Sequence, residues 1–184
     1  IEEVIADIGY VNLETELDNI CTDIAEQRKY SFDHYNCVHG LGHGIMAVTQ
    51  NELFESLATC DVLSEHWDAA SCWSGAFMEN IMADNRNHFT AYLKSEEPLY
   101  PCTAVDAQYK STCYLMQTSY ILKLNNQDFK ETFNLCKKAD EGFQDICYQS
   151  LGRDASGLTV SDAPRAKDIC LLGEDFEQES NCVI

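Results

Sequence analysis

The ten cysteines of this chain fall into five pairs with nearly regular spacing. In four pairs the two cysteines are eleven or twelve positions apart, and in the first pair they are sixteen apart. The pairs are Cys21 with Cys37, Cys60 with Cys72, Cys102 with Cys113, Cys136 with Cys147, and Cys170 with Cys182. The second cysteines recur at steps of 35, 41, 34 and 35 residues. An internal repeat of this length is typical of stacked helical hairpins.

The even cysteine count also predicts five structural disulfides and therefore an oxidising compartment, so that the protein is secreted, periplasmic or on the cell surface. The spacing within each pair is too long for a zinc knuckle. No Cys-x-x-Cys motif occurs, which argues against thioredoxin-like chemistry and c-type haem attachment. The alternative interpretation is a cytosolic protein with buried thiols.

The fourth pair shows why each pair is expected to join two helices. Phe129 and Cys136 lie on one apolar helical stripe, and Asp128 is placed to cap the start of that helix. Gly142 then interrupts the pattern, as a residue beyond a helix C-terminus would. Cys136 and Cys147 lie six and five residues from this glycine, so they would face each other across an antiparallel hairpin.

The predicted fold is therefore all-α: one domain over residues 1–184, an α-solenoid of about five disulfide-stapled antiparallel helical hairpins. The hairpins are expected near 4–48, 50–84, 88–124, 127–157 and 161–184, the last one truncated. The third has a longer entry through Pro98 and Pro101, and either Ser161 or Asp162 is expected to cap the helix that begins at Pro164. The residues expected in the core are Phe54, Leu57, Trp73, Phe77, Leu115, Phe133 and Leu151.

The charge and the hydropathy pattern exclude several classes of partner. With 12 basic and 31 acidic residues, the net charge is −19, which argues against nucleic acids and anionic membrane surfaces. It permits a basic partner or metal cations, although a solubilising surface is the simplest reading. No run of about 18 apolar residues predicts a membrane span. The first residues, from Ile1 to Val4, lack the pattern of a signal peptide.

The chain resembles tetratricopeptide and Sel1-like helical-repeat proteins, and its disulfide in each hairpin resembles the cysteine-rich Sel1-like secreted proteins of bacteria. The resemblance is carried by Cys136-x10-Cys147-Tyr148-Gln149-Ser150-Leu151-Gly152 and extends from Cys60 to Cys182. The cysteine spacing is longer here, and the consensus glycines and alanines of that family are missing. The resemblance implies a helical scaffold that binds a protein or peptide partner.

One segment, Cys37-Val38-His39-Gly40-Leu41-Gly42-His43-Gly44, has the pattern of a site. On a helix, the i, i+4 spacing of His39 and His43 places both imidazoles on one face. Metalloproteases with His-Glu-x-x-His use this spacing, but Gly40 stands in place of the catalytic Glu. The three glycines each disfavour a helix by about 1 kcal/mol, so they indicate close helix packing or room for a ligand. Hydrogen-bonded histidines without a metal are the alternative.

The second helices of the predicted hairpins can be aligned by counting from the second cysteine of each pair, and this alignment extends the site. His39 and His43 are the second and sixth residues after Cys37, and the corresponding later positions form a predicted polar groove that includes Tyr120, Arg153 and Asp154. A third metal ligand would come from Glu79 or Met78, and His34 is a weaker candidate for a fourth. Imidazole with Glu suits zinc or iron, whereas Met suits reduced copper.

Three functions remain open from the sequence. The first is an extracytoplasmic scaffold that binds a protein or peptide partner, with a histidine-based metal site. The second is a metal-dependent enzyme or metal carrier that uses His39 and His43. The third is a structural assembly subunit that associates with itself through the ends of the repeat array.

Overall fold

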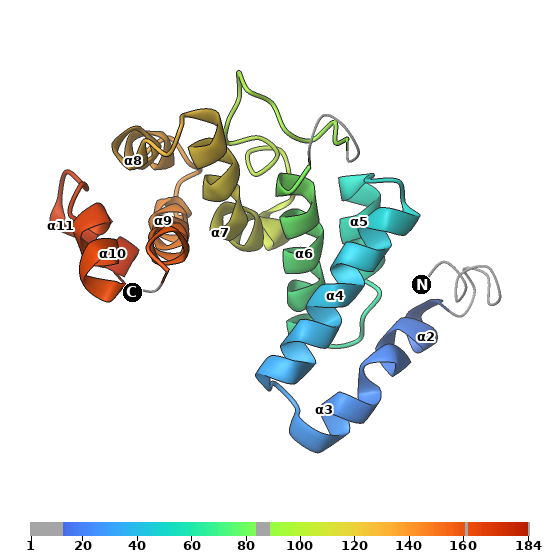
Figure 1. The fold of residues 1–184 in the computed structure, drawn as a ribbon. Coiled ribbons are helices and arrows are strands. Elements are labelled where there is room, and N and C mark those ends of the chain that lie inside the picture. The colour runs from blue at the N-terminus through green and yellow to red at the C-terminus, as the bar shows by residue number, and fades with distance from the viewer. Residues whose placement is uncertain (1–12, 84–88, 161, 184) are drawn as a thin grey trace. The chain divides into compact units, whose positions relative to one another are not determined.

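The computed structural model describes residues 13–83, 89–160 and 162–183, and in these ranges the regular structure is helical (Figure 1). The helices are α2 (Leu13–Ile20), α3 (Thr22–Arg28), α4 (Phe32–Val48), α5 (Leu53–Cys60), α6 (His66–Ile81), α7 (Ala107–Leu124), α8 (Phe129–Cys136), α9 (Gln144–Leu158), α10 (Ala163–Cys170) and α11 (Phe176–Val183). No strand occurs in the described ranges, so the all-α prediction is confirmed.

The chain forms two compact units, residues 1–91 and 92–184. The solenoid of five hairpins and the single-domain boundary stay predictions. Several predicted hairpin ends, at residues 4, 84, 88, 161 and 184, lie outside the described residues, as does the alternative cap Ser161.

All five predicted disulfides are confirmed, and no cysteine is free. Their Cα–Cα distances run from 5.4 Å for Cys170–Cys182 to 5.9 Å for Cys21–Cys37. These distances suit a bridge between two neighbouring segments. Each bond joins cysteines that are near in sequence, so the disulfides fasten local pairs of segments.

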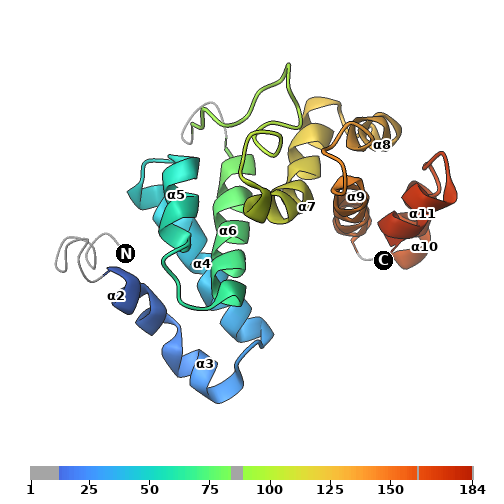
Figure 2. The same cartoon turned by 180° about the vertical axis from the view of Figure 1, so that it is seen from behind.

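In the first unit, α6 packs against both α4 and α5 (Figure 2). Helix α5 buries a stripe at i, i+4 and i+7, formed by Leu53, Leu57 and Cys60, each with no exposed surface. Trp73 of α6 is also buried, and its indole N–H donates to a carboxylate oxygen of Asp61 over 2.9 Å. The pairing of α5 with α6 is therefore held by apolar packing, the Cys60–Cys72 bond and this hydrogen bond.

Helices α4 and α6 approach each other closely at two glycines. A methyl group at Gly42 would overlap the carbonyl oxygen of Cys72 and the backbone of Gly75. A methyl group at Gly75 would overlap the carbonyl oxygen of His39. Of the two uses that the sequence indicates for the glycines, Gly42 therefore serves close packing, and it sets how near the histidines of α4 lie to α6.

In the second unit, α9 packs against α7, α8, α10 and α11. The segment 92–106, which precedes α7, forms no helix, so the third predicted hairpin lacks a first helix. It contains Pro98 and Pro101, which disfavour a helix interior. The buried side chain of Gln117 donates to the carbonyl oxygens of Pro98 and Tyr100, and these bonds hold the segment against α7.

Most of the predicted core and caps are found. Asp128 and Asp162 accept hydrogen bonds from the backbone N–H groups three residues later, as N-caps do. Of the predicted core residues, Leu115 is half-buried, and five are buried: Leu57, Trp73, Phe77, Phe133 and Leu151. The prediction for Phe54 is wrong, because its side chain is 41% exposed. It lies beside the stripe that α5 turns toward α6.

Within the described part of the chain, no helix combines the length and the apolar character needed to cross a membrane.

Candidate functional site

The two histidines of the glycine-rich segment lie one turn apart on α4, whose N-terminus is capped by Ser31. The Nε2 atoms of His39 and His43 face each other at 3.2 Å. The rings are nearly edge-to-face, with centroids 4.9 Å apart. The i, i+4 spacing therefore brings one nitrogen of each ring to a common point.

The other nitrogen of each ring is held by a residue of α6. Nδ1 of His43 lies 2.5 Å from a carboxylate oxygen of Glu79. Nδ1 of His39 lies 2.7 Å from the hydroxyl of Ser74, and the hydroxyl of Tyr35 lies 3.2 Å from the same nitrogen. The Tyr35 and Ser74 hydroxyls are themselves 3.1 Å apart. Both rings are thus oriented from behind by hydrogen bonds.

The partners of the Nδ1 atoms decide where the ring protons lie. A carboxylate only accepts, so Nδ1 of His43 donates to Glu79. The Ser74 hydroxyl donates its single proton to the carbonyl oxygen of Ser71 over 2.7 Å, so its oxygen accepts from Nδ1 of His39. In the neutral rings, both Nε2 atoms then carry lone pairs. Two lone pairs facing each other at 3.2 Å repel unless a cation, either a proton or a metal ion, lies between them.

The environment of His39 disfavours an added proton. Burial, followed by the charge of His43, lowers the pKa of His39 below its ordinary value. Neutral imidazole is the form that binds metals. The arrangement can therefore hold a cation between the two Nε2 atoms, either a shared proton or a metal ion.

A third metal ligand stays a prediction. Among residues 13–83, 89–160 and 162–183, no group of three or more His, Cys, Asp and Glu side chains is arranged to hold a metal. The structure brings Glu79 to His43 but at Nδ1, where it fixes the orientation of the ring. Met78 precedes Glu79 on α6 and is half-buried.

His34, the candidate fourth ligand, has both ring nitrogens engaged elsewhere. Its Nδ1 accepts from the backbone N–H of Tyr30 over 3.3 Å, and its Nε2 lies 3.4 Å from a carboxylate oxygen of Asp68. The ring is almost fully buried, with Trp67 at a centroid distance of 4.9 Å. Burial raises the pKa of Asp68, and the nearby His34 opposes this shift. His34 thus belongs to a separate polar pair.

Two predicted groove residues form a compact ionic network in the second unit. The Arg153 guanidinium donates to the carbonyl oxygen of Leu115 and to the Ser119 hydroxyl, each over 2.6 Å, and to a carboxylate oxygen of Asp154 over 2.7 Å. The second oxygen of Asp154 accepts from Thr118 over 2.7 Å. The third predicted residue, Tyr120, is buried, and burial raises the pKa of its hydroxyl.

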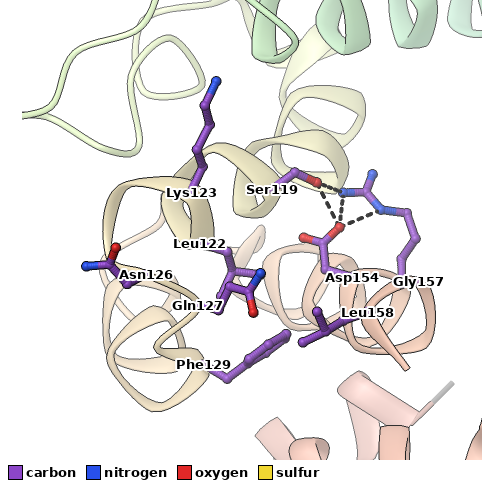
Figure 3. A pocket seen from close by; sticks show the side chains of 10 residues that line it. Ser119, Leu122, Lys123, Asn126, Gln127, Phe129, Asp154, Gly157 and Leu158 are labelled. Carbon is purple, nitrogen blue, oxygen red and sulfur yellow. Dashed lines mark hydrogen bonds and ion pairs between the residues drawn. The ribbon is translucent and has the colours of Figure 1, made fainter. Parts of the chain in front are cut away.

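This network forms one wall of an open pocket of about 830 Å³ (Figure 3). Leu122, Phe129 and Leu158 supply its apolar surface, and Gln127 lies beside them. Apolar surface beside a few fixed polar groups is typical of ligand pockets. Tyr120 is not among the residues that line this pocket.

The sequence reasoning missed the residues behind the histidines. Tyr35 precedes His39 by four positions, so a helical wheel would have placed it on the same face. Ser74 occupies in α6 the position that His39 occupies in α4, each two residues after the second cysteine. The contact of Ser74 with His39 depends on how the two helices cross, which the glycine pair determines.

Comparisons with protein-family models, curated proteins and solved structures found no match for this chain.

Proposed function

We propose that this chain is a secreted, periplasmic or surface-exposed helical scaffold that binds a transition-metal ion between Nε2 of His39 and Nε2 of His43. The observation that carries the proposal is the 3.2 Å separation of two lone-pair nitrogens whose opposite ring nitrogens are both occupied. A metal about 2.0–2.1 Å from each nitrogen would make an N–metal–N angle of about 100°, which is close to the tetrahedral value.

The remaining coordination positions give the scaffold a means of recognising a partner. His43 is 29% exposed and Glu79 is 24% exposed, so the pair lies near the surface. A metal held by two protein ligands accepts further ligands from solvent, from a substrate or from a protein partner. Metal-dependent partner binding is therefore the form of the scaffold hypothesis that this site supports.

The test is metal binding by the purified, fully oxidised protein. Zinc titration against a competing chelator should give one site per chain, and His39→Ala or His43→Ala should abolish it. His66→Ala is the matched control, because His66 is an exposed histidine at the start of α6. Equal zinc affinity in the wild type and both site variants would contradict the proposal. A shared proton seen by nitrogen NMR, with no metal bound, would do the same.

A further inference from the structure

The α7–α9 contact of the second unit reproduces, position by position, the α4–α6 contact of the first. Positions are counted from the second cysteine of each pair. In the first unit, Gly75 lies at +3 and meets the carbonyl oxygen of His39 at +2. In the second, Ser150 lies at +3 and its hydroxyl donates to the carbonyl oxygen of Leu115 at +2, over 2.6 Å. The two helix pairs therefore share one register.

The polar contacts follow the same register. His43 at +6 contacts Glu79 at +7 of the next helix, over 2.5 Å. Ser119 at +6 contacts Asp154 at +7 of the next helix, over 2.7 Å. In both units, an acidic side chain at +7 of the second helix thus contacts the +6 residue of the first helix. The residue just before that acid, at +6 of the second helix, is Met78 in the first unit and Arg153 in the second.

In the second unit a fixed cation occupies this location. The Arg153 guanidinium donates to the main-chain carbonyl oxygen of Leu115 at +2 and to the side chains of Ser119 at +6 and Asp154 at +7. The first unit has His39 and His43 at the corresponding +2 and +6 positions, and Glu79 at +7. It has the same acidic support but no arginine, because Met78 stands at the arginine position.

Building on the metal site proposed above, we propose that Met78 supplies the third ligand, through its thioether sulfur, and that the ion is monovalent copper. The bound ion then takes, between His39 and His43, the place that the Arg153 guanidinium takes in the second unit. Thioether sulfur is a soft ligand that selects reduced copper over zinc, and two imidazoles with one thioether suit that ion.

The experiment compares two ions and three substitutions at or near α6. Monovalent copper is supplied in ascorbate, with a chromogenic copper(I) chelator as competitor, so that no thiol reductant attacks the disulfides. Zinc is titrated in parallel. Met78→Leu removes the sulfur and keeps the volume. Met78→Arg places a guanidinium where the second unit has one. Met82→Leu is the matched control, because Met82 caps the same helix and is 63% exposed.

Met78→Leu should weaken copper binding at least tenfold and change zinc binding less than twofold. Met78→Arg should abolish the binding of both ions while circular dichroism and the disulfide map stay unchanged, and Met82→Leu should behave as the wild type. Copper binding of wild-type strength in Met78→Leu would overturn the assignment of the third ligand. Zinc binding without copper binding would overturn the choice of ion. Either result would leave the proposed histidine site intact. The site itself would be rejected if His39→Ala bound both copper and zinc as tightly as the wild type.

Discussion

Gly42 of α4 and Gly75 of α6 face each other where their helices approach closely, and the position of a Cβ on Gly75 lies 3.1 Å from Cα of Gly42. The neighbouring Gly40 has a different environment, because a Cβ there would meet no atom within 4 Å. Gly40 and Gly42 lie two positions apart on the same helix, but only at Gly42 would an added methyl group clash. Substituting each by alanine therefore separates the effect of helix packing from that of helix propensity.

Gly42→Ala should destabilise the protein by about 1–3 kcal/mol, because the methyl group overlaps backbone that cannot move without separating the helices. Gly40→Ala should stabilise it by about 1 kcal/mol through helix propensity alone. Urea unfolding of the oxidised, metal-free protein measures both changes. Equal free energies of unfolding for the two variants would contradict the close crossing.

Glu79→Gln should weaken zinc binding about 10–100-fold while His39 and His43 remain in place. The amide keeps the shape of the side chain but removes the charge that holds Nδ1 of His43. Glu55→Gln, an exposed change on α5, is the control for the general loss of one negative charge. An unchanged zinc affinity in Glu79→Gln would show that the carboxylate has no role in the site.

Asp140 should make the stability of the second unit sensitive to acid. Its hydrogen bond from Lys110 is the main cause that lowers the pKa of Asp140, and the hydroxyl of Tyr114 adds a bond of 2.9 Å. Because the pKa of Asp140 is lower in the folded state, the carboxylate stabilises the fold above its unfolded pKa of about 4. This stabilisation disappears as the pH falls through the folded-state pKa of Asp140. Asp140→Asn should therefore be less stable than the wild type at pH 7. Its free energy of unfolding should also fall less than that of the wild type when the pH is lowered. Urea unfolding at pH 7 and below pH 3 tests this, with Asp168→Asn, an exposed change on α10, as the control.

Replacing both Cys136 and Cys147 with Ala should lower the free energy of unfolding by about 2–3 kcal/mol, because the bond closes a short loop in the unfolded chain. The other four bonds should form as before, since each closes its own loop. Peptide mapping without reduction checks the pairing. Exchange of partners among the remaining cysteines would show that the bonds depend on one another.

The sequence predicts the local features of this fold well. Cysteine spacing alone predicts all five bonds, and Asp128 and Asp162 mark helix starts by their capping chemistry. These features depend on residues within about 16 positions of each other, which helical geometry connects directly.

The failures come from contacts between elements. Phe54 fits the apolar pattern of α5, but the face that packs on α6 runs through Leu53 and Leu57. The spacing of His39 and His43 predicts their shared face, whereas the contact of His39 with Ser74 requires the crossing of α4 and α6. No local pattern gives the position of a hydroxyl thirty-five residues away.

The local closure of the disulfides has a consequence for proteolysis. The bond between Cys60 and Cys72 spans the turn between α5 and α6, and the bond between Cys136 and Cys147 spans the turn between α8 and α9. A protease that cuts in either turn would leave both fragments in one covalent molecule until reduction. A cut between α9 and α10 crosses no disulfide loop, so the C-terminal segment would then be held only by its non-covalent packing against α9.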